Sequence, residues 1–166
     1  QSFSINLKNR YSNVVGYRAK PHTDLIDLEK TNFYEKEDFW EPVTTKFNKI
    51  VLDPGAFYIL SSQEYVSVPP QLAAEMAPYL SMIGEFRVHY AGFFDPGFGY
   101  SSNGKQNSRA VLEVRCHETP FVLEHGQTVG QLIFEKMLEV PDLLYGKDLK
   151  SNYQGQGLKL SKHFKN

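Results

Sequence analysis

The chain has 166 residues, about the length of one domain and long enough to bury its own hydrophobic core. Its 18 Lys and Arg nearly balance its 19 Asp and Glu, so no basic surplus indicates a nucleic acid partner. The only cysteine is Cys116, which excludes a disulfide within the chain, and no apolar run approaches the length of a membrane span. We therefore expect a cytoplasmic protein without nucleic acid or membrane partners.

Short strand-like runs dominate the chain. In chain order they cover residues 14–19, 50–53, 57–60, 64–68, 86–91, 109–115, 121–124 and 129–135. Turn signals such as Asp53-Pro-Gly55, Asp95-Pro-Gly97 and His125-Gly126 separate these runs. Many short strands with closely spaced turns are typical of a β-sandwich or a distorted barrel.

The remaining segments are less regular. Pro70 can open a short helix over residues 71–77, and Pro78 would end it. The acidic segment 24–40 is predicted to hold either a helical turn or an irregular excursion, and the Gly-rich segment 145–166 to form an ordered arm or a mobile flap. We expect one domain with an irregular lead-in over about 1–48, a β core over 49–140 and a carboxy-terminal arm over 141–166.

Four segments together resemble the dCTP deaminase and dUTPase superfamily. They are Leu52-Asp-Pro-Gly-Ala-Phe-Tyr-Ile-Leu60 with Glu64-Tyr-Val-Ser-Val-Pro69, Ala91-Gly-Phe-Phe-Asp-Pro-Gly-Phe-Gly99, Ala110-Val-Leu-Glu-Val114 with Gly126-Gln-Thr-Val-Gly-Gln-Leu132, and Asn152-Tyr-Gln-Gly-Gln156. The phrase Gly84-Glu-Phe-Arg-Val-His-Tyr-Ala-Gly-Phe-Phe-Asp-Pro-Gly-Phe98 is similar to the carboxy-terminal half of double-length dCTP deaminases, in which two dUTPase-like halves are fused. The resemblance implies a mainly β fold, a dUTPase-like distorted barrel or jelly roll (β-clip) with one short helix.

Three positions depart from the family pattern on its phosphate and sugar side. Met82 stands where the resemblance places the Arg of a Ser-Ser-x-x-Arg motif, and Phe93 replaces an Arg before the Asp-Pro-Gly turn. Asn152 replaces the Lys of the arm. A triphosphate site is therefore not completed by these positions alone, and the isolated chain is expected to depend on another half.

The resemblance implies that Glu113 is the catalytic base of deamination. The strand pattern sets Glu113 with Arg109, Val111 and Arg115 on one face, where the two arginines favour the ionised form that a base needs. A salt-bridge ladder on a polar strand face is the alternative reading of the same residues. Zinc deaminases need three His or Cys ligands, and with Cys116 as the single cysteine we expect no zinc and no other protein-bound metal.

Six further residues are expected to bind substrate. Asp95 supports the sugar hairpin or simply caps its turn, and Phe98 packs on the sugar or in the core. Gln156 reads a base edge or lies in a solvated tail, since an amide both donates and accepts. Arg87 either compensates for lost phosphate contacts or belongs to a polar outer strand. The set is completed by Arg115 and Tyr153.

Three functions remain open from the sequence. The first is hydrolytic deamination of dCTP to dUTP, with Mg²⁺ carried by the triphosphate. The second is dUTP pyrophosphatase activity, alone or combined, using Asp95 and a water molecule. The third is a non-catalytic half that completes a shared site. The resemblance also implies a homotrimer, or a pseudo-trimeric assembly with an amino-terminal homologous half. The tail lysines Lys159, Lys162 and Lys165 either cover phosphates or form a solvated end.

Overall fold

The computed structural model describes residues 1–9, 12–78, 86–88, 92–101, 108–146, 149, 151 and 153–165. Within these residues the chain folds into eleven strands and one four-residue helix. The strands are β1 (Ser2–Ser4), β2 (Val14–Ala19), β3 (Trp40–Thr44), β4 (Lys49–Leu52), β5 (Phe57–Val66), β6 (Leu72–Pro78), β7 (Phe86–Val88), β8 (Phe93–Phe94), β9 (Ser108–Cys116), β10 (Phe121–Glu124) and β11 (Thr128–Lys136); the helix is α1 (Lys36–Phe39). The mainly β fold with one short helix is confirmed.

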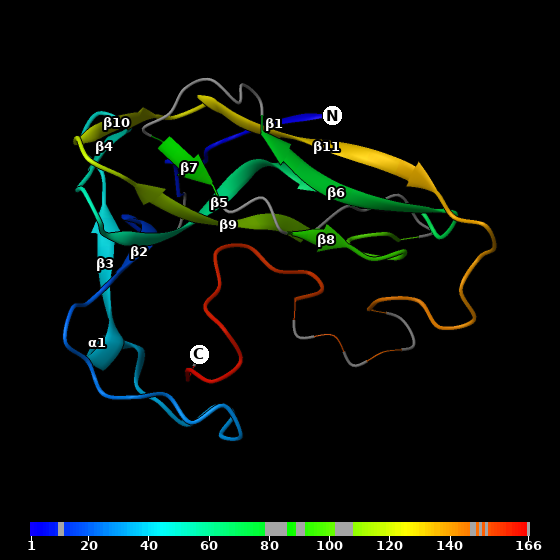
Figure 1. Ribbon diagram of the computed structural model, residues 1–166, viewed down its shortest axis with the longest axis horizontal. Helices are drawn as coiled ribbons and strands as arrows, with labels where there is room; N and C mark the ends of the chain where they lie inside the picture. The colour runs from blue at the N-terminus through cyan, green and yellow to red at the C-terminus, as the bar shows by residue number, and fades with distance from the viewer. Residues whose placement is uncertain are drawn as a thin grey trace.

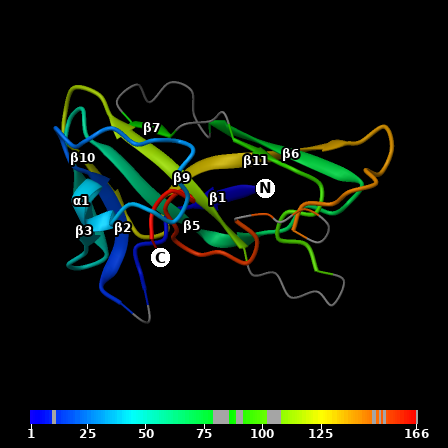
Figure 2. The same ribbon diagram turned by 90° about the horizontal axis from the view of Figure 1, so that it is seen from below.

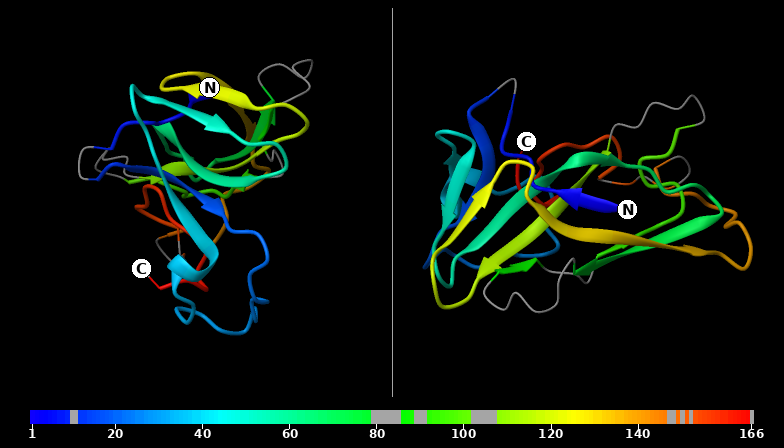
Figure 3. Two further views of the ribbon diagram at one scale, coloured as in Figure 1. Left: turned by 90° about the vertical axis from the view of Figure 1, so that its left-hand side faces the viewer. Right: turned by 90° about the horizontal axis from the view of Figure 1, so that it is seen from above.

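Three antiparallel sheets build the domain (Figure 1). One has the strand order β1-β11-β6-β8, the second has the order β3-β2-β5-β9-β7, and β10 pairs with β4 in the third. The views in Figures 1 and 3 place the β11–β6 pair over β5 and β9, so the two larger sheets form layers. The two predicted runs 57–60 and 64–68 belong to one strand, β5, whose pairing with β9 shifts between Ser61 and Tyr65.

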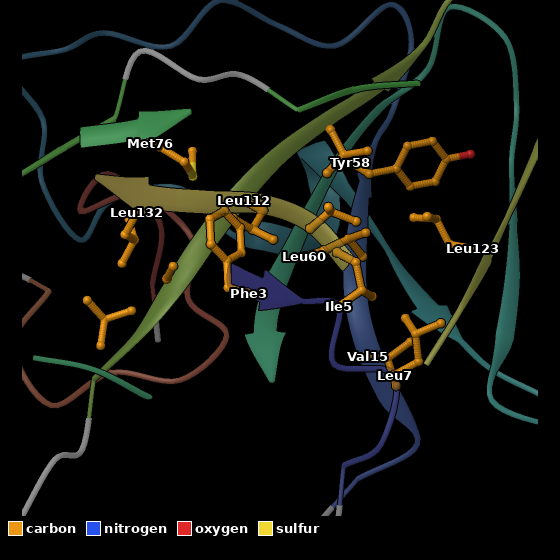
Figure 4. Packing of buried hydrophobic residues seen from close by; sticks show 14 of the residues in the cluster. Phe3, Ile5, Leu7, Val15, Tyr58, Leu60, Met76, Leu112, Leu123 and Leu132 are labelled. Atoms are coloured by element: carbon orange, nitrogen blue, oxygen red, sulfur yellow. The ribbon is translucent and has the colours of Figure 1, made fainter. Parts of the chain in front are cut away.

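The main core lies between these layers. Figure 4 shows Phe3, Leu60, Leu112 and Leu132 converging from β1, β5, β9 and β11. Residues of β9 alternate as predicted: Ala110, Leu112 and Val114 are fully buried, while the side chains between them face the opposite side of the strand.

The helix predicted over residues 71–77 was wrong, because this segment forms strand β6. Its Ala-rich sequence favours a helix locally, but β6 pairs with β11 from Leu72 opposite Lys136 to Pro78 opposite Gly130. On its other side β6 pairs with β8, and Ala74 and Met76 are buried in the main core. Burial and two ladders of backbone hydrogen bonds outweigh the helical preference of a few alanines. The one helix lies instead at Lys36–Phe39, within the acidic segment.

The predicted lead-in is more regular than its sequence indicated, because residues 1–48 contain β1, β2 and β3. The acidic segment then meets the carboxy-terminal arm. Backbone N–H groups of Asn32 and Phe33 donate to the carbonyl oxygens of Lys162 and His163, and the Lys165 N–H donates to the Tyr34 carbonyl. Figures 1 and 2 show the C-terminal segment in red, beside β9 and next to the lead-in.

A second, smaller hydrophobic cluster forms where these two segments meet. Its buried members are Phe39, Ile59, Leu160 and Phe164. The aromatic rings pack edge to face, with ring centroids 5.4 Å apart for Tyr34 and Phe39 and 5.6 Å apart for Phe39 and Phe164. We call this set the arm cluster. It fixes the arm against the outer face of the β5–β9 pair.

Candidate functional site

Strand β9 presents Glu113 on the face that points away from the main core. Glu113 lies opposite Ile59 of β5 in the ladder, and its neighbours Leu112 and Val114 are fully buried on the other face. Because successive side chains of a strand point to opposite faces, the Glu113 carboxylate lies on the face away from the core. Glu113 and Val111 face a cavity between β9, the arm and the segment after β8.

This cavity has a volume of about 380 Å³, and its walls are mainly apolar, with many aromatic side chains. Five of the predicted site residues line it together: Asp95, Phe98, Glu113, Tyr153 and Gln156. Other lining side chains were not predicted: Trp40, Phe57, Ile59, Tyr145 and Ser161 are among them. The apolar walls and a few placed polar groups suit a small planar ligand with a polar edge. We call it the aromatic cavity.

The Asp95-Pro-Gly-Phe98 turn forms one wall. The Phe98 N–H donates to the Asp95 carbonyl over 3.0 Å, and the Gly97 N–H donates to the Val68 carbonyl over 3.0 Å. Gly97 and Gly99 have φ angles of 100° and 62°, which favour glycine. A Cβ at Gly99 would also overlap the carbonyl oxygen of Val66, the last residue of β5. The turn sequence is therefore dictated by backbone geometry, and it holds Phe98 and Asp95 at the cavity.

Phe98 packs in the core and also lines the cavity. Its side chain is buried, and its ring lies 5.1 Å from the Phe94 ring and 5.5 Å from the Tyr145 ring, centroid to centroid. Such packing fixes the orientation of an aromatic wall before any ligand enters.

The arm is held against the turn and β9 by hydrogen bonds. Gln154 Oε1 accepts from the Gly99 N–H over 3.0 Å, and Ser108 Oγ accepts from the Gly155 N–H over 2.8 Å. The Arg109 N–H donates to the Gln156 carbonyl over 2.9 Å. These bonds place Tyr153 and Gln156 at the cavity.

Two buried polar atoms of cavity residues have no hydrogen-bond partner in the described part of the chain. They are the donor Nε1 of Trp40 and the acceptor Oε1 of Gln156. An unsatisfied buried polar group costs about 1–3 kcal/mol. A ligand that offers one acceptor and one donor would remove part of this cost, and the amidine edge of a pyrimidine carries both kinds of group.

Tyr145 is the clearest cavity residue that sequence reasoning missed. Its pKa is raised above the usual tyrosine value chiefly by burial, while a backbone hydrogen bond with Tyr153 acts in the opposite direction and nearby Asp95 adds to the rise. The phenol therefore stays protonated and is available as a donor. Nothing in the local pattern around Tyr145 marks it. Trp40 was missed for the same reason, since it reaches the cavity only through the folding of the lead-in.

Arg115 and Arg109 are not among the residues that line the aromatic cavity. The Arg115 guanidinium lies over the Phe57 ring at 4.9 Å, so it supports a cavity wall from behind. Arg109 Nη1 donates to the carbonyl oxygens of Ser62 and Gln63 at 2.7 and 2.6 Å, and the guanidinium packs over Tyr65. Arg87 is described only as a backbone position of β7, opposite Arg115. Met82 and Asn152 lie outside the described residues.

Phe93, one of the three departures from the family pattern, lies within the described residues. Its side chain lines the aromatic cavity and is 77% exposed, so the position where the family resemblance expects an arginine does face the site. Among the described residues, no group of three or more His, Cys, Asp or Glu side chains lies close enough to hold a metal ion. In the same residues no helix has the length and apolar character needed to cross a membrane.

The fold and the cavity first define a class. The chain is a mainly β, dUTPase-like domain, and its aromatic cavity carries two carboxylates and an amide. Comparison with known proteins then gives the family. Residues 1–164 match the family described as 2'-deoxycytidine 5'-triphosphate deaminase, C-terminal domain, and the chain belongs to this family.

Individual relatives agree with this assignment. The chain is 30% identical over 172 residues to a protein of Streptomyces griseus called "dCTP deaminase, dUMP-forming", a match that covers 100% of this chain and 83% of the relative. A protein of the same name from Methanobrevibacter smithii is 30% identical, and that match covers 84% of this chain and 68% of the relative. The crystal structure of 2'-deoxycytidine 5'-triphosphate deaminase from Agrobacterium tumefaciens is similar at 54% identity and a TM-score of 0.80. That match covers 89% of this chain but 43% of the Agrobacterium chain, so this chain spans less than half of that protein.

Proposed function

We propose that this domain contributes the deamination site of a dCTP deaminase, with Glu113 as the general base. The observation that carries the proposal is the convergence of Asp95, Phe98, Glu113, Tyr153 and Gln156 on one aromatic cavity, although they come from three separate segments. Family membership supports dCTP as the substrate. The cytosine would lie between the aromatic walls, with its polar edge toward Gln156 and Glu113.

The chemistry needs one base that also moves protons. Glu113 takes a proton from a water molecule, and the resulting hydroxide adds to C4 of the cytosine. The carboxylic acid then protonates N3 and becomes a carboxylate again. It next takes the proton of the new C4 hydroxyl and passes it to the exocyclic nitrogen, so that the C4–N bond breaks, ammonia leaves and the C4 carbonyl of a uracil forms. Each of these transfers requires the carboxylate within hydrogen-bond reach of the reacting edge. A strand position at the cavity, on a rigid ladder between β5 and β7, suits this requirement.

The test is the substitution Glu113→Gln in the full protein. It keeps the shape and a hydrogen-bonding side chain but removes the base, so kcat for ammonia release should fall by about 100-fold or more. Glu139→Gln changes an exposed glutamate outside the cavity lining and serves as the control. Nucleotide affinity should change little in either variant. Full turnover by Glu113→Gln would refute the assignment.

A second candidate function is the combined formation of dUMP from dCTP. The relatives from Streptomyces griseus and Methanobrevibacter smithii are called dUMP-forming, and Asp95, the residue proposed for water activation at a phosphate, lies in the same cavity as Glu113. Product analysis separates the two reactions. Deamination alone yields dUTP and ammonia, whereas the combined reaction yields dUMP, pyrophosphate and ammonia. Loss of pyrophosphate but not ammonia in Asp95→Asn would assign the second step to Asp95.

We propose a reaction without zinc, in which Mg²⁺ arrives on the triphosphate. Mg²⁺ can keep phosphate oxygens and water molecules as its ligands, so it needs no carboxylate from the part of the cavity where Glu113 acts as the base. Treatment with a zinc chelator, followed by restoration of Mg²⁺, should leave the rate unchanged. A loss of activity that only zinc restores would contradict this proposal.

The phosphate side of the site is proposed to be completed by another copy or another half. Phe93 offers no positive charge at its cavity position, and the match with the Agrobacterium chain covers 43% of that chain. A homotrimer, or a pseudo-trimer with an amino-terminal homologous half, would supply the missing groups. Sedimentation of the full protein during turnover checks this. A fully active monomer without such a half would contradict shared sites.

The third functional alternative is a non-catalytic half. In that case Glu113→Gln would have no effect on the rate of ammonia release.

A further inference from the structure

A second, smaller cavity lies beside the aromatic cavity and has a different chemical character. Its volume is about 190 Å³, and three lysines line it: Lys36 of α1, and Lys159 and Lys165 of the arm. Tyr17 and Ser161 contribute hydroxyl-bearing side chains. The two cavities share Lys159, Leu160 and Ser161, so the same short stretch of the arm borders both. We call it the lysine cavity.

The charge around the lysine cavity is one-sided. Its described lining residues include three lysines and no carboxylate, in a chain whose 18 basic and 19 acidic residues otherwise nearly balance. Lys165 is paired with Glu35, which neutralises one of the three charges and holds that side chain in place. In the described part of the chain no ion pair engages Lys36, whose side chain is half-buried.

Lys36 and Lys159 are partly buried and Lys165 is exposed, and positively charged side chains that border one cavity favour an anion there. The three lysines come from segments more than 120 residues apart in the sequence, since Lys36 and Lys159 are brought together only by the arm cluster. Lysine ammonium groups with hydroxyl donors are a common way to bind phosphate oxygens. A phosphate group also fits the position next to a cavity that holds a nucleoside.

We propose that the lysine cavity is a binding site for phosphate groups, with Lys36, Lys159 and Lys165 as its cations. This inference rests on the proposed function in one respect: a nucleotide in the aromatic cavity is the nearest source of such groups. The site would supply, from this chain itself, positive charge that is absent at Phe93. A free polyphosphate offers the same chemistry and is the other source.

The first experiment uses inorganic tripolyphosphate, which has neither base nor sugar, and calorimetric titration of the full protein. Lys36→Gln is the informative variant, because Lys159 borders both cavities and Lys165 also holds Glu35. The substitution keeps length and helix propensity. Lys136→Gln, an exposed lysine at the end of β11 outside both linings, is the matched control.

The wild type should bind tripolyphosphate saturably, Lys36→Gln should weaken it by about tenfold or more, and Lys136→Gln should leave it unchanged. Circular dichroism of the three proteins establishes that each is folded. Equal affinity of the wild type and Lys36→Gln would overturn the proposal, as would the absence of saturable binding.

A second arm identifies the source of the phosphate. The titration is repeated with Glu113→Gln saturated with dCTP. If dCTP prevents tripolyphosphate binding, the phosphates of the nucleotide occupy the lysine cavity; if both bind together, it holds a separate polyphosphate. Either result keeps the site. The proposed function fails separately, through normal ammonia release by Glu113→Gln, and that outcome leaves the tripolyphosphate result intact.

Discussion

The main core and the arm cluster are both hydrophobic, but they arise in different ways. The main core is built from strands whose buried residues alternate along the sequence, as in Ala110, Leu112 and Val114. The arm cluster joins Phe39 of the lead-in with Leu160 and Phe164 of the arm, across more than 120 residues of chain. The two larger sheets thus supply strand β9 with the proposed base Glu113, whereas the arm cluster lies between the lead-in and the arm, which border both cavities.

This contrast suggests a division of stability and function. The main core is continuous through both larger sheets, so its loss should unfold the whole domain. The arm cluster involves the last described residues of the chain and is small enough to open by itself. Substitutions in the two regions should therefore differ in what they disrupt, and three predictions test the difference.

The largest effect on stability is expected for Leu112→Ala in β9. Leu112 is fully buried, and its truncation leaves a cavity in the main core, so the free energy of unfolding should fall by about 2–5 kcal/mol. Urea unfolding measures this change. Val122→Ala, on an exposed position of β10, should change stability by less than about 0.5 kcal/mol. Similar values for both would remove the distinction between core and surface on which the comparison rests.

A smaller change in global stability, with a larger change in binding, is expected for Phe164→Ala. Phe164 packs against Phe39 and Trp40, and Trp40 lines the aromatic cavity. The free energy of unfolding should fall by about 1–2 kcal/mol, because the cluster can open locally. Amide exchange should accelerate in the arm while β9 stays protected, and dCTP affinity should fall.

Hydrogen exchange with mass spectrometry and nucleotide titration measure these effects. Phe47→Ala, at a residue 91% exposed, provides the aromatic control. If Phe164→Ala accelerates exchange equally in β9 and in the arm, the arm cluster is part of one cooperative unit with the barrel.

The smallest effect is expected from His125, which belongs to the barrel. Its Nδ1 accepts a hydrogen bond from the Leu7 N–H over 3.2 Å. Burial lowers the pKa of His125 below its usual 6.5, the charge of Lys8 lowers it further, and a backbone hydrogen bond with Ile5 acts in the opposite direction.

Because the pKa of His125 is lower in the folded state, the unfolded state binds the proton more readily. The contribution of His125 to folding stability is therefore complete above about pH 6.5 and is lost as the pH falls below that value. The urea midpoint should therefore decrease slightly between about pH 7.5 and about pH 5.5, and it should decrease less in His125→Asn. An identical pH dependence in both proteins would show that His125 does not contribute.

Local sequence was most informative where local geometry decides. Strands β2 and β10 begin and end at the predicted residues, and the predicted alternation set Glu113 on the outer face of β9. It was least informative at residues 71–77, where alanines favour a helix but pairing with β11 and β8 makes a strand. The strand pattern placed Arg109 and Arg115 on the same face as Glu113, but it did not predict where their long side chains extend. In the structure their guanidinium groups pack over Tyr65 and Phe57.

The sequence by itself indicated the mainly β fold, because strand periodicity and turn chemistry act between near neighbours. The family resemblance indicated five residues of the aromatic cavity. Only the tertiary structure decided that Trp40, Tyr145 and Lys36 belong to the two cavities. Trp40 and Lys36 reach their places through packing of the lead-in against the arm, and Tyr145 through packing against Phe98. Such contacts depend on the shape and burial of segments far apart in the chain, and a local sequence pattern does not predict them.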